Sequence, residues 1–205
     1  VEVAKSGKGQ IIDSAMTDGS ALLMSMMYGF YSAGIWNDHR GSNLLDGAAH
    51  FYGCYECKDN KFVSIGSIEP QFYQELIKRL EVDEETFKDQ MDRSKWPELK
   101  KILEKKFKEK TREEWCEIME GGDVCFAPVL SLEESINYKH NKDRETFVNI
   151  DGVTQPAPAP RFSNTPGKIK HPPVRKGENT REILKSIGKE DLVQELIESK
   201  IISEG

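Results

Sequence analysis

The stretch from residue 50 to residue 80 limits the possible folds most, because its hydrophobic period changes halfway. It begins HFYGCYECKDNKFVSIGSI, two runs rich in aromatic and β-branched residues that flank a turn with Asp59 and Asn60, which is the pattern of a β-hairpin. A helix is expected from Pro70 onward, because proline lacks only an N–H that the first helical turn leaves unused. Its apolar face would consist of Phe72, Tyr73, Leu76, Ile77 and Leu80. A mixed α and β fold follows.

The rest of the chain continues this mixture. Further helices are expected at about 83–91, 96–109 and 111–120, the last opened by a capping box from Thr111 to Glu114. VCFAPVL has the pattern of a short strand, and Ser131 opens another capped helix. The segment from 149 to 175 holds most of the chain's nine prolines and is expected to run extended as a connector. Two short helices, broken at Gly188, should end the chain.

The N-terminal part is rich in alanine, leucine and methionine. From Ile11 to Met27 it predicts one largely buried helix with a weak point at Gly19. Its methionines are Met16, Met24, Met26 and Met27. Unbranched thioethers pack well in cores, and they also make a deformable surface that suits varied acyl chains. The sequence leaves both roles open for these side chains.

The composition argues against several classes of protein. A formal net charge of -6, with lysine and arginine spread along the chain, gives no basic face for nucleic acid. No run of about 18 apolar residues occurs, so no membrane span is expected, and the opening VEVAKSGKGQ lacks the apolar core of a signal peptide. Four cysteines in 205 residues are too few for a disulfide scaffold. We therefore expect an intracellular protein with free thiols.

Cysteine and histidine offer little obvious chemistry. Cys54 and Cys57 form a C-x-x-C pair, but no second pair completes a metal site, and residues three apart on a strand point to opposite faces. Cys116 and Cys125 have the surroundings of core residues. The four histidines are scattered and each has the surroundings of a surface residue; only His50, at the start of the hairpin, has a position that a ligand could also approach. No metal site is expected.

Glu69 stands between the second strand and the proline that opens the helix. A glutamate is a mediocre N-cap, yet the helix dipole and the first backbone N–H groups stabilise a negative charge there. Such a carboxylate is either a favourable charge in a first helical turn or a base available to a substrate. The sequence pattern alone does not choose between the two.

Six segments, in their order along the chain, resemble the racemase branch of the family III CoA-transferase superfamily. They are GKGQIIDSAMTDGSALL, RGSNLLDGAAHFYGCYEC, VSIGSIEPQFY, WPELKKIL, DVCFAPVLSLEE and PAPRFSNTP. The likeness extends over essentially the whole chain. The part that looks most like the racemases is IEPQFY, residues 68–73, which contains Glu69.

This resemblance implies an activity, the inversion of the 2-methyl-bearing carbon of 2-methylacyl-CoA thioesters by a two-base enolate mechanism without a cofactor. In the family, a His supported by an Asp serves one face of the substrate, and the Glu that Glu69 matches serves the other. The His, the Asp and most CoA-binding elements precede the GKGQIID segment. Since this chain also starts without Met, we expect a fragment of a longer enzyme that is inactive alone.

The resemblance also implies an architecture. Residues 1–50 would be a connecting helix and loop from the large domain, residues 51–149 a small α+β domain with the hairpin, and residues 150–205 a proline-rich return with C-terminal helices. Two subunits would interlock as a homodimer, with the acyl-CoA substrate between the large domain of one and the small domain of the other. Substrate contacts are implied at Met16, Met24, Asp46 and Gly47.

The sequence departs from the family pattern in one loop, and two functions other than a racemase stay open. Residues 47–50 are GAAH, whereas the family commonly has Gly-Gly-Ala-Pro after the Leu-Asp pair, so the loop at Asp46 and Gly47 could differ in shape. A CoA-transferase of the same superfamily would use an upstream Asp to form an acyl anhydride, and a non-catalytic association module would need neither group. The Ile-Glu-Pro-Gln motif favours the racemase. Its location would be cytoplasmic in a bacterium, and mitochondrial or peroxisomal in a eukaryote.

Overall fold

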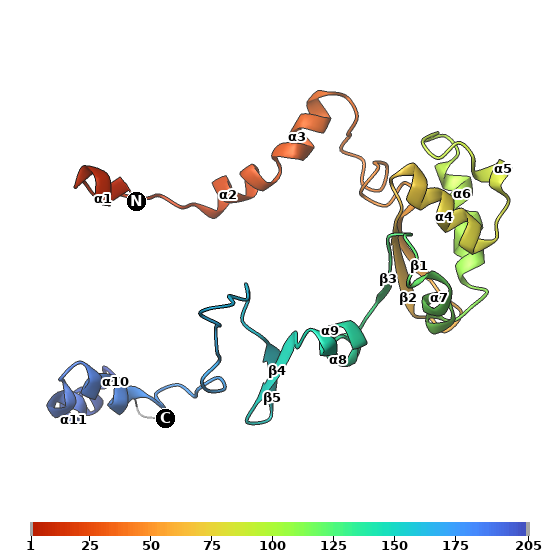
Figure 1. The fold of residues 1–205 in the computed structure, drawn as a ribbon. Coiled ribbons are helices and arrows are strands. Elements are labelled where there is room, and N and C mark those ends of the chain that lie inside the picture. The colour runs from red at the N-terminus through yellow and green to blue at the C-terminus, as the bar shows by residue number, and fades with distance from the viewer. Residues whose placement is uncertain (1, 204–205) are drawn as a thin grey trace. The chain divides into compact units, whose positions relative to one another are not determined.

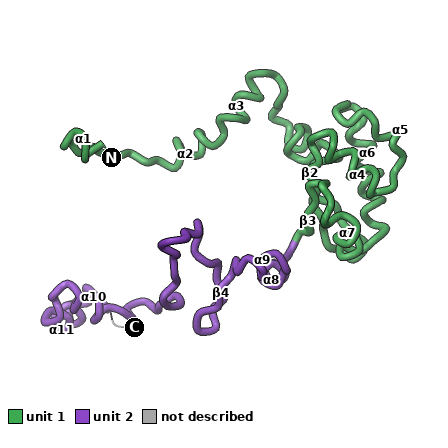
Figure 2. Tube along the Cα trace, viewed as in Figure 1, with its two compact units in different colours: residues 1–129 green, residues 130–205 purple. Residues whose placement is uncertain are grey.

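A computed structural model describes residues 2–203 of the chain, which divides into two compact units, Val1–Val129 and Leu130–Gly205 (Figure 2). The helices of the first unit are α1 (Glu2–Ser6), α2 (Met16–Leu23), α3 (Ser25–Ser32), α4 (Pro70–Leu80), α5 (Glu84–Phe87), α6 (Trp96–Phe107) and α7 (Arg112–Met119). Its strands are β1 (Tyr52–Glu56), β2 (Phe62–Gly66) and β3 (Phe126–Val129). The mixed α and β fold is confirmed, while the expected domain boundaries at residues 50 and 149 stay predictions.

The predicted hairpin is present as β1 and β2. The two strands pair antiparallel from Tyr52 opposite Gly66 to Glu56 opposite Phe62. The three residues between Cys57 and Lys61 close the turn, and Asn60 takes the left-handed conformation with φ +59° that asparagine tolerates well. The later strand β3 pairs antiparallel with the other edge of β2, so the sheet order is β1–β2–β3. β2 is therefore the central strand, and it leads directly to Glu69.

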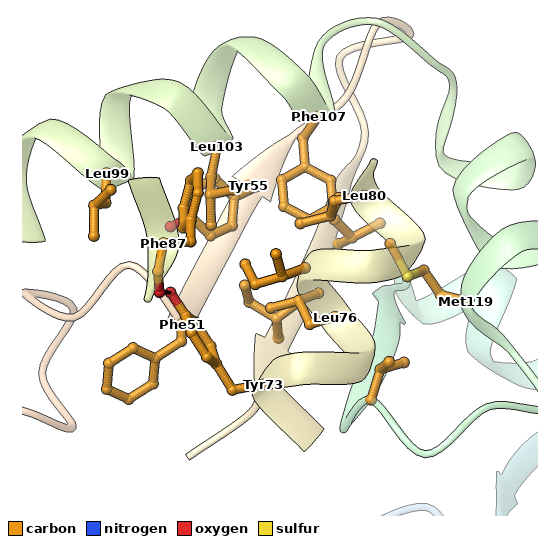
Figure 3. Packing of buried hydrophobic residues seen from close by; sticks show 14 of the residues in the cluster. Phe51, Tyr55, Tyr73, Leu76, Leu80, Phe87, Leu99, Leu103, Phe107 and Met119 are labelled. Atoms are coloured by element: carbon orange, nitrogen blue, oxygen red, sulfur yellow. Dashed lines mark hydrogen bonds between the residues drawn. The ribbon is translucent and has the colours of Figure 1, made fainter. Parts of the chain in front are cut away.

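Helices α4, α6 and α7 lie beside this sheet and share one core with it (Figure 1). Alternation along β2 buries Val63 and Ile65, as the period of a strand requires. Helix α4 buries Tyr73, Leu76, Ile77 and Leu80, which confirms most of its predicted apolar face; Phe72 is half-buried. Figure 3 shows Tyr73, Leu76 and Leu80 of α4 among labelled side chains of β1, α5, α6 and α7. Burial of this continuous apolar surface is what holds the first unit together.

The helix starts agree with the sequence signals more closely than the helix lengths do. The predicted capping box of α7 is present, with Thr111 and Glu114 each accepting the other's backbone N–H. Asp83 caps α5, but that helix ends at Phe87, so the expectation of a helix over 83–91 was too long. Helix α6 ends at Phe107, two residues before the predicted end. Local capping chemistry thus predicts where helices begin, and packing decides where they stop.

The second unit contains short elements. They are α8 (Leu132–Asn137), α9 (Lys139–Asp143), β4 (Phe147–Ile150), β5 (Val153–Pro156), α10 (Thr180–Ser186), a 3₁₀ turn η1 (Glu190–Leu192) and α11 (Val193–Glu198). The capping box at Ser131 and the break at Gly188, which has φ +68°, are confirmed. The extended connector predicted from residue 149 was partly wrong, because β4 and β5 form a hairpin around Asp151 and Gly152.

The N-terminal expectation was wrong in two respects. Residues 11–27 form parts of two helices rather than one, and the irregular residue is Met24, with φ −84° and ψ 4°, rather than Gly19. The segment is also exposed rather than buried: Leu23 keeps 87% of its surface accessible and Ile11 keeps 98%. Its apolar pattern is real, but within the described residues no core covers it. In the described part of the chain, none of the helices has the length and apolarity needed to cross a membrane.

Candidate functional site

Glu69 is the exposed N-cap residue of α4, and Ser67 and Ile68 connect it to the end of β2 at Gly66. Its backbone is extended, with φ −70° and ψ 141°, and Pro70 occupies the first helical turn. Its side chain makes no capping hydrogen bond to the helix, and within residues 2–203 no ion pair engages it. The carboxylate is therefore not used to hold its own helix. It is exposed and can be reached by another molecule.

The turn that carries Glu69 is attached to the core on two sides. Ser67 is fully buried; its N–H donates to the Phe51 carbonyl at 3.1 Å and its hydroxyl donates to the Val124 carbonyl at 2.7 Å. The N–H of Gly66 donates to the carbonyl of Cys125 at 2.9 Å. These bonds join the turn to the start of β1 and to the loop before β3. Glu69 therefore projects from a fixed support rather than from a mobile loop.

A third attachment comes from Gln90, which lies after α5 and is 9% exposed. Its amide nitrogen Nε2 donates to the carbonyl of Ser67 at 3.0 Å and to that of Ile68 at 2.8 Å. The indole N–H of Trp96 in turn donates to the carbonyl of Gln90 at 2.8 Å. Gln90 could not be predicted from the sequence, since a single glutamine in a polar stretch carries no signal before the fold brings it under the turn.

Cys125 lies at the edge of this site, because its carbonyl is bonded to Gly66. The expectation of a core residue was wrong for Cys125, which is exposed with φ +49°, and right for Cys116, which is buried. Partial burial, followed by the negative charges of Glu69 and Asp123, raises the pKa of the Cys125 thiol. The thiol is therefore protonated at neutral pH and is not an activated nucleophile.

The loop with Asp46 and Gly47 is held mainly by its own hydrogen bonds. The Asp46 carboxylate accepts from the backbone N–H of Gly41 at 3.1 Å and from both the backbone and side-chain amides of Asn43 at 2.7 Å. Burial acts to raise the pKa of Asp46, but these bonds outweigh it and the pKa is lowered. Lys100 Nζ donates to the Gly47 carbonyl at 2.6 Å. Asp46 thus organises the loop, and substrate contacts at Asp46 and Gly47 stay a prediction.

The two methionines singled out from the sequence are accessible. Met16 begins α2 and is 87% exposed, while Met24 separates α2 from α3 and is 49% exposed. Core packing is thus excluded for Met16 within the described residues. Contact with an acyl chain stays a prediction for both side chains.

His50 is a fully buried core residue, so both roles that the sequence left open for it, a surface residue or a neighbour of a ligand, were wrong. Its Nε2 lies 2.7 Å from the Tyr73 hydroxyl, which itself donates to the carbonyl of Phe87 at 2.9 Å. The hydroxyl proton is thereby engaged, so Nε2–H is the donor and Nδ1 is an unprotonated nitrogen without a partner in the described structure. Burial lowers the pKa of His50 to about 4. His50 is neutral at pH 7 and cannot reach a substrate.

The cysteine pair behaves as the strand geometry predicts. Cys54 in β1 is exposed, whereas Cys57, directly after β1, is buried, which agrees with side chains that point to opposite faces. Across residues 2–203, histidine, cysteine and carboxylate side chains nowhere gather in a set of three suited to a metal ion.

Comparison with known proteins identifies the family to which this site belongs. The model of CoA-transferase family III matches residues 1–180. This chain belongs to CoA-transferase family III. Alpha-methylacyl-CoA racemase of Mus musculus is 42% identical over 94% of the chain, and that of Homo sapiens is 42% identical over 97% of it. The likeness to racemases inferred from the IEPQFY segment is thus confirmed.

The fold of this family III chain is also found in a solved structure. A CaiB/BaiF family protein from Brucella suis aligns with a TM-score of 0.68 over 91% of the chain and 50% of that protein, at 20% identity. The two racemases are likewise matched over only 52% and 53% of their own lengths. The chain therefore spans about half the length of the curated relatives it matches.

Proposed function

We propose that this family III chain contributes one of two acid/base groups to a racemase of 2-methylacyl-CoA thioesters, and that this group is Glu69. The observation that carries the proposal is the exposed carboxylate of Glu69, which caps no helix yet stands on a turn fixed to the core. A carboxylate that only stabilised its helix would bond the first backbone N–H groups. The identity to the two racemases supports the choice of reaction.

The reaction needs a base on each face of the α-carbon. One group removes the proton from the carbon between the methyl branch and the thioester carbonyl, and the C–H electron pair moves into an enolate. The opposite group then donates a proton to the other face, which restores the thioester with inverted configuration. Glu69 would act on one face only. Its partner would be a His supported by an Asp in a preceding segment, as the resemblance implies.

The decisive experiment exchanges the α-proton of a 2-methylacyl-CoA for deuterium in heavy water. The enzyme would be the complete protein, meaning this chain joined to the segment that carries the His. Glu69→Gln keeps the shape and removes the base, so we expect exchange and racemisation to fall by about 10²- to 10⁴-fold. Mass spectrometry of the recovered thioester measures the exchange, and chiral analysis measures the inversion.

A matched control separates the base from a favourable helix charge. Glu98 is an exposed carboxylate in the first turn of α6. Glu98→Gln should lower stability about as much as Glu69→Gln, by less than about 1 kcal/mol, and leave exchange unchanged. Full exchange in the Glu69→Gln protein would contradict the proposal, and so would full exchange by the 205-residue chain alone.

The exposed apolar residues of α2 and α3 support a proposal about partners. Leu22, Leu23, Met26 and Tyr28 are each more than half exposed, a surface that proteins normally cover. In the proposed enzyme it would be covered by the preceding segment or by the second subunit of an interlocked homodimer. Sedimentation should give twice the monomer mass for the complete protein, and a stable monomer would contradict this arrangement.

A second candidate is CoA transfer between carboxylic acids, which the description of the matching family favours. That reaction would form an acyl anhydride with an upstream Asp and would not need Glu69. Incubation with an acyl-CoA and a labelled acceptor acid distinguishes the two. Labelled thioester that forms equally well with Glu69→Gln would favour the transferase. For the racemase, the proposed role lies in fatty acid metabolism, in the cytoplasm of a bacterium or in the mitochondria or peroxisomes of a eukaryote.

A further inference from the structure

The side-chain amide of Gln90 holds the backbone just before Glu69 in a bent conformation. Successive carbonyls of an extended strand point in opposite directions. Here the carbonyls of Ser67 and Ile68 both face the same nitrogen, Gln90 Nε2, at 3.0 and 2.8 Å. The N–H of Ile68 also donates to the Gly66 carbonyl at 2.9 Å, which closes a three-residue turn. An amide group with two N–H donors fits this bent arrangement, and an apolar side chain would not.

Gln90 is itself held in place. The indole N–H of Trp96 donates to the Gln90 carbonyl, and Trp96 is 3% exposed among the core side chains at the start of α6. A chain of hydrogen bonds thus runs from Trp96 through Gln90 to the two carbonyls before Glu69. The opposite side of the turn is fixed separately by the hydroxyl of Ser67. The direction in which Glu69 projects therefore depends on the hydrogen bonds from Gln90 on one side of the turn and on the hydrogen bond of the Ser67 hydroxyl on the other.

We propose that Gln90 is a positioning residue for the Glu69 carboxylate. The inference rests on the proposed function, because it gives Gln90 a role only if Glu69 moves the proton. A base works when its oxygen lies within hydrogen-bond reach of the C–H proton, and a misplacement of about 1 Å can lower the rate about 10²-fold. Without the Gln90 donors, the carbonyls of Ser67 and Ile68 lose their partner, and the peptide before Glu69 is no longer confined to one orientation.

The main test is Gln90→Met, which keeps a long unbranched side chain and removes both donors. In the complete protein we expect kcat for α-proton exchange to fall about 10- to 100-fold, with KM within about 2-fold, because the base is misplaced and the binding surface is intact. In the 205-residue chain, ¹⁵N relaxation should show increased mobility at Ile68 and Glu69. Trp96→Phe removes the indole bond to Gln90, together with part of a buried ring that packs against Phe51, and should loosen the turn less than Gln90→Met does.

Two controls separate positioning from stability. Gln74→Met makes the same substitution at an exposed glutamine of α4 and should change neither kcat nor the turn. Ile77→Val removes one buried methylene from α4, lowering stability by about 1 kcal/mol without touching the donors, and should leave kcat unchanged. If Gln90→Met does not fold, hydrogen-bond couplings from the Gln90 side-chain amide to the Ser67 and Ile68 carbonyls test the geometry directly in the unaltered chain.

Each outcome bears on a distinct claim. A looser turn with unchanged kcat would overturn the positioning role, and so would an unchanged turn in Gln90→Met or the absence of couplings from the Gln90 amide. A fall in kcat matched by Ile77→Val would also overturn it, since general destabilisation would then explain the effect. Exchange that survives Glu69→Gln would instead refute the proposed function, whether or not Gln90→Met loosens the turn.

Discussion

Residues 49–124 and residues 11–32 are both rich in apolar side chains, yet only the first stretch builds a core from its own sequence. Leu103 of α6 is fully buried, while Leu23 of α2 keeps 87% of its surface accessible. In the core, rings from separate elements meet: Tyr55 stacks on Phe107 with centroids 4.9 Å apart, and Phe107 meets the edge of Trp115 at 5.2 Å. Helical periodicity produces helices in both stretches, but burial requires an opposing apolar face.

The largest effect expected from this comparison is on core packing. Leu103→Ala leaves a cavity among side chains that cannot fully collapse, so it should lower the free energy of unfolding by about 3 kcal/mol. The identical substitution Leu23→Ala creates no cavity and replaces one good helix former by another, so it should change stability by less than about 0.5 kcal/mol. Urea unfolding of the 205-residue chain, followed by tryptophan fluorescence, measures both.

Equal effects of the two substitutions would show that α2 packs in solution. That result would mean that the exposed segment finds a partner, either within the chain or in a second copy. A concentration-dependent unfolding midpoint for Leu23→Ala would identify the second copy, since association stabilises by mass action.

The same contrast explains which parts of the fold the sequence predicts. The hairpin, the Pro70 helix start and the capping boxes at Thr111 and Ser131 depend on neighbouring residues, and these predictions were confirmed. Burial of residues 11–27 depends on what packs against them, which sequence periodicity does not state, and that prediction was wrong. The β4–β5 hairpin was not predicted, because the prolines of this segment argued against regular structure. Pro156 is tolerated there because it ends an edge strand, where a missing N–H removes no required hydrogen bond.

The site shows the same division. Glu69 could be singled out because a carboxylate before a helix-opening proline is a local pattern. Gln90 could not, because its two acceptors lie more than twenty residues away in sequence. His50 was given either a surface role or a position open to a ligand, because it adjoins a glycine-containing loop, but the ring enters the core and meets Phe51, Tyr73 and Phe87.

The next largest expected effect is a loss of folding stability in acid. It should arise in the core, where His50 is buried. The pKa of His50 is about 4 in the folded chain and about 6.5 when unfolded, so the unfolded state binds the proton more readily. The stability that His50 contributes is complete above pH 6.5 and is lost as the pH falls toward 4. The expected loss is about 2 kcal/mol between pH 7 and pH 5, and about 3 kcal/mol in full.

Urea unfolding of the 205-residue chain at pH 7, 6 and 5 measures this slope. His50→Phe removes the titrating group and should flatten the slope, whatever it does to stability at pH 7. His39→Phe changes an exposed histidine and should leave the slope as it is. A slope that persists in His50→Phe would place the acid sensitivity in other groups and contradict the assignment.

The smallest effect expected concerns one capping motif found in both units. Thr111 opens α7, which buries Trp115 and Cys116 in the core, whereas Ser131 opens α8, which buries no residue. Thr111→Ala should lower the free energy of unfolding of the first unit by about 1 kcal/mol, because a lost cap destabilises a helix on which the core depends. Ser131→Ala removes the same bonds and should leave that transition unchanged, with only local loss of protection from amide exchange in α8. If the two substitutions lower the free energy of unfolding equally, α8 unfolds together with the core, and the two units unfold as a single cooperative unit.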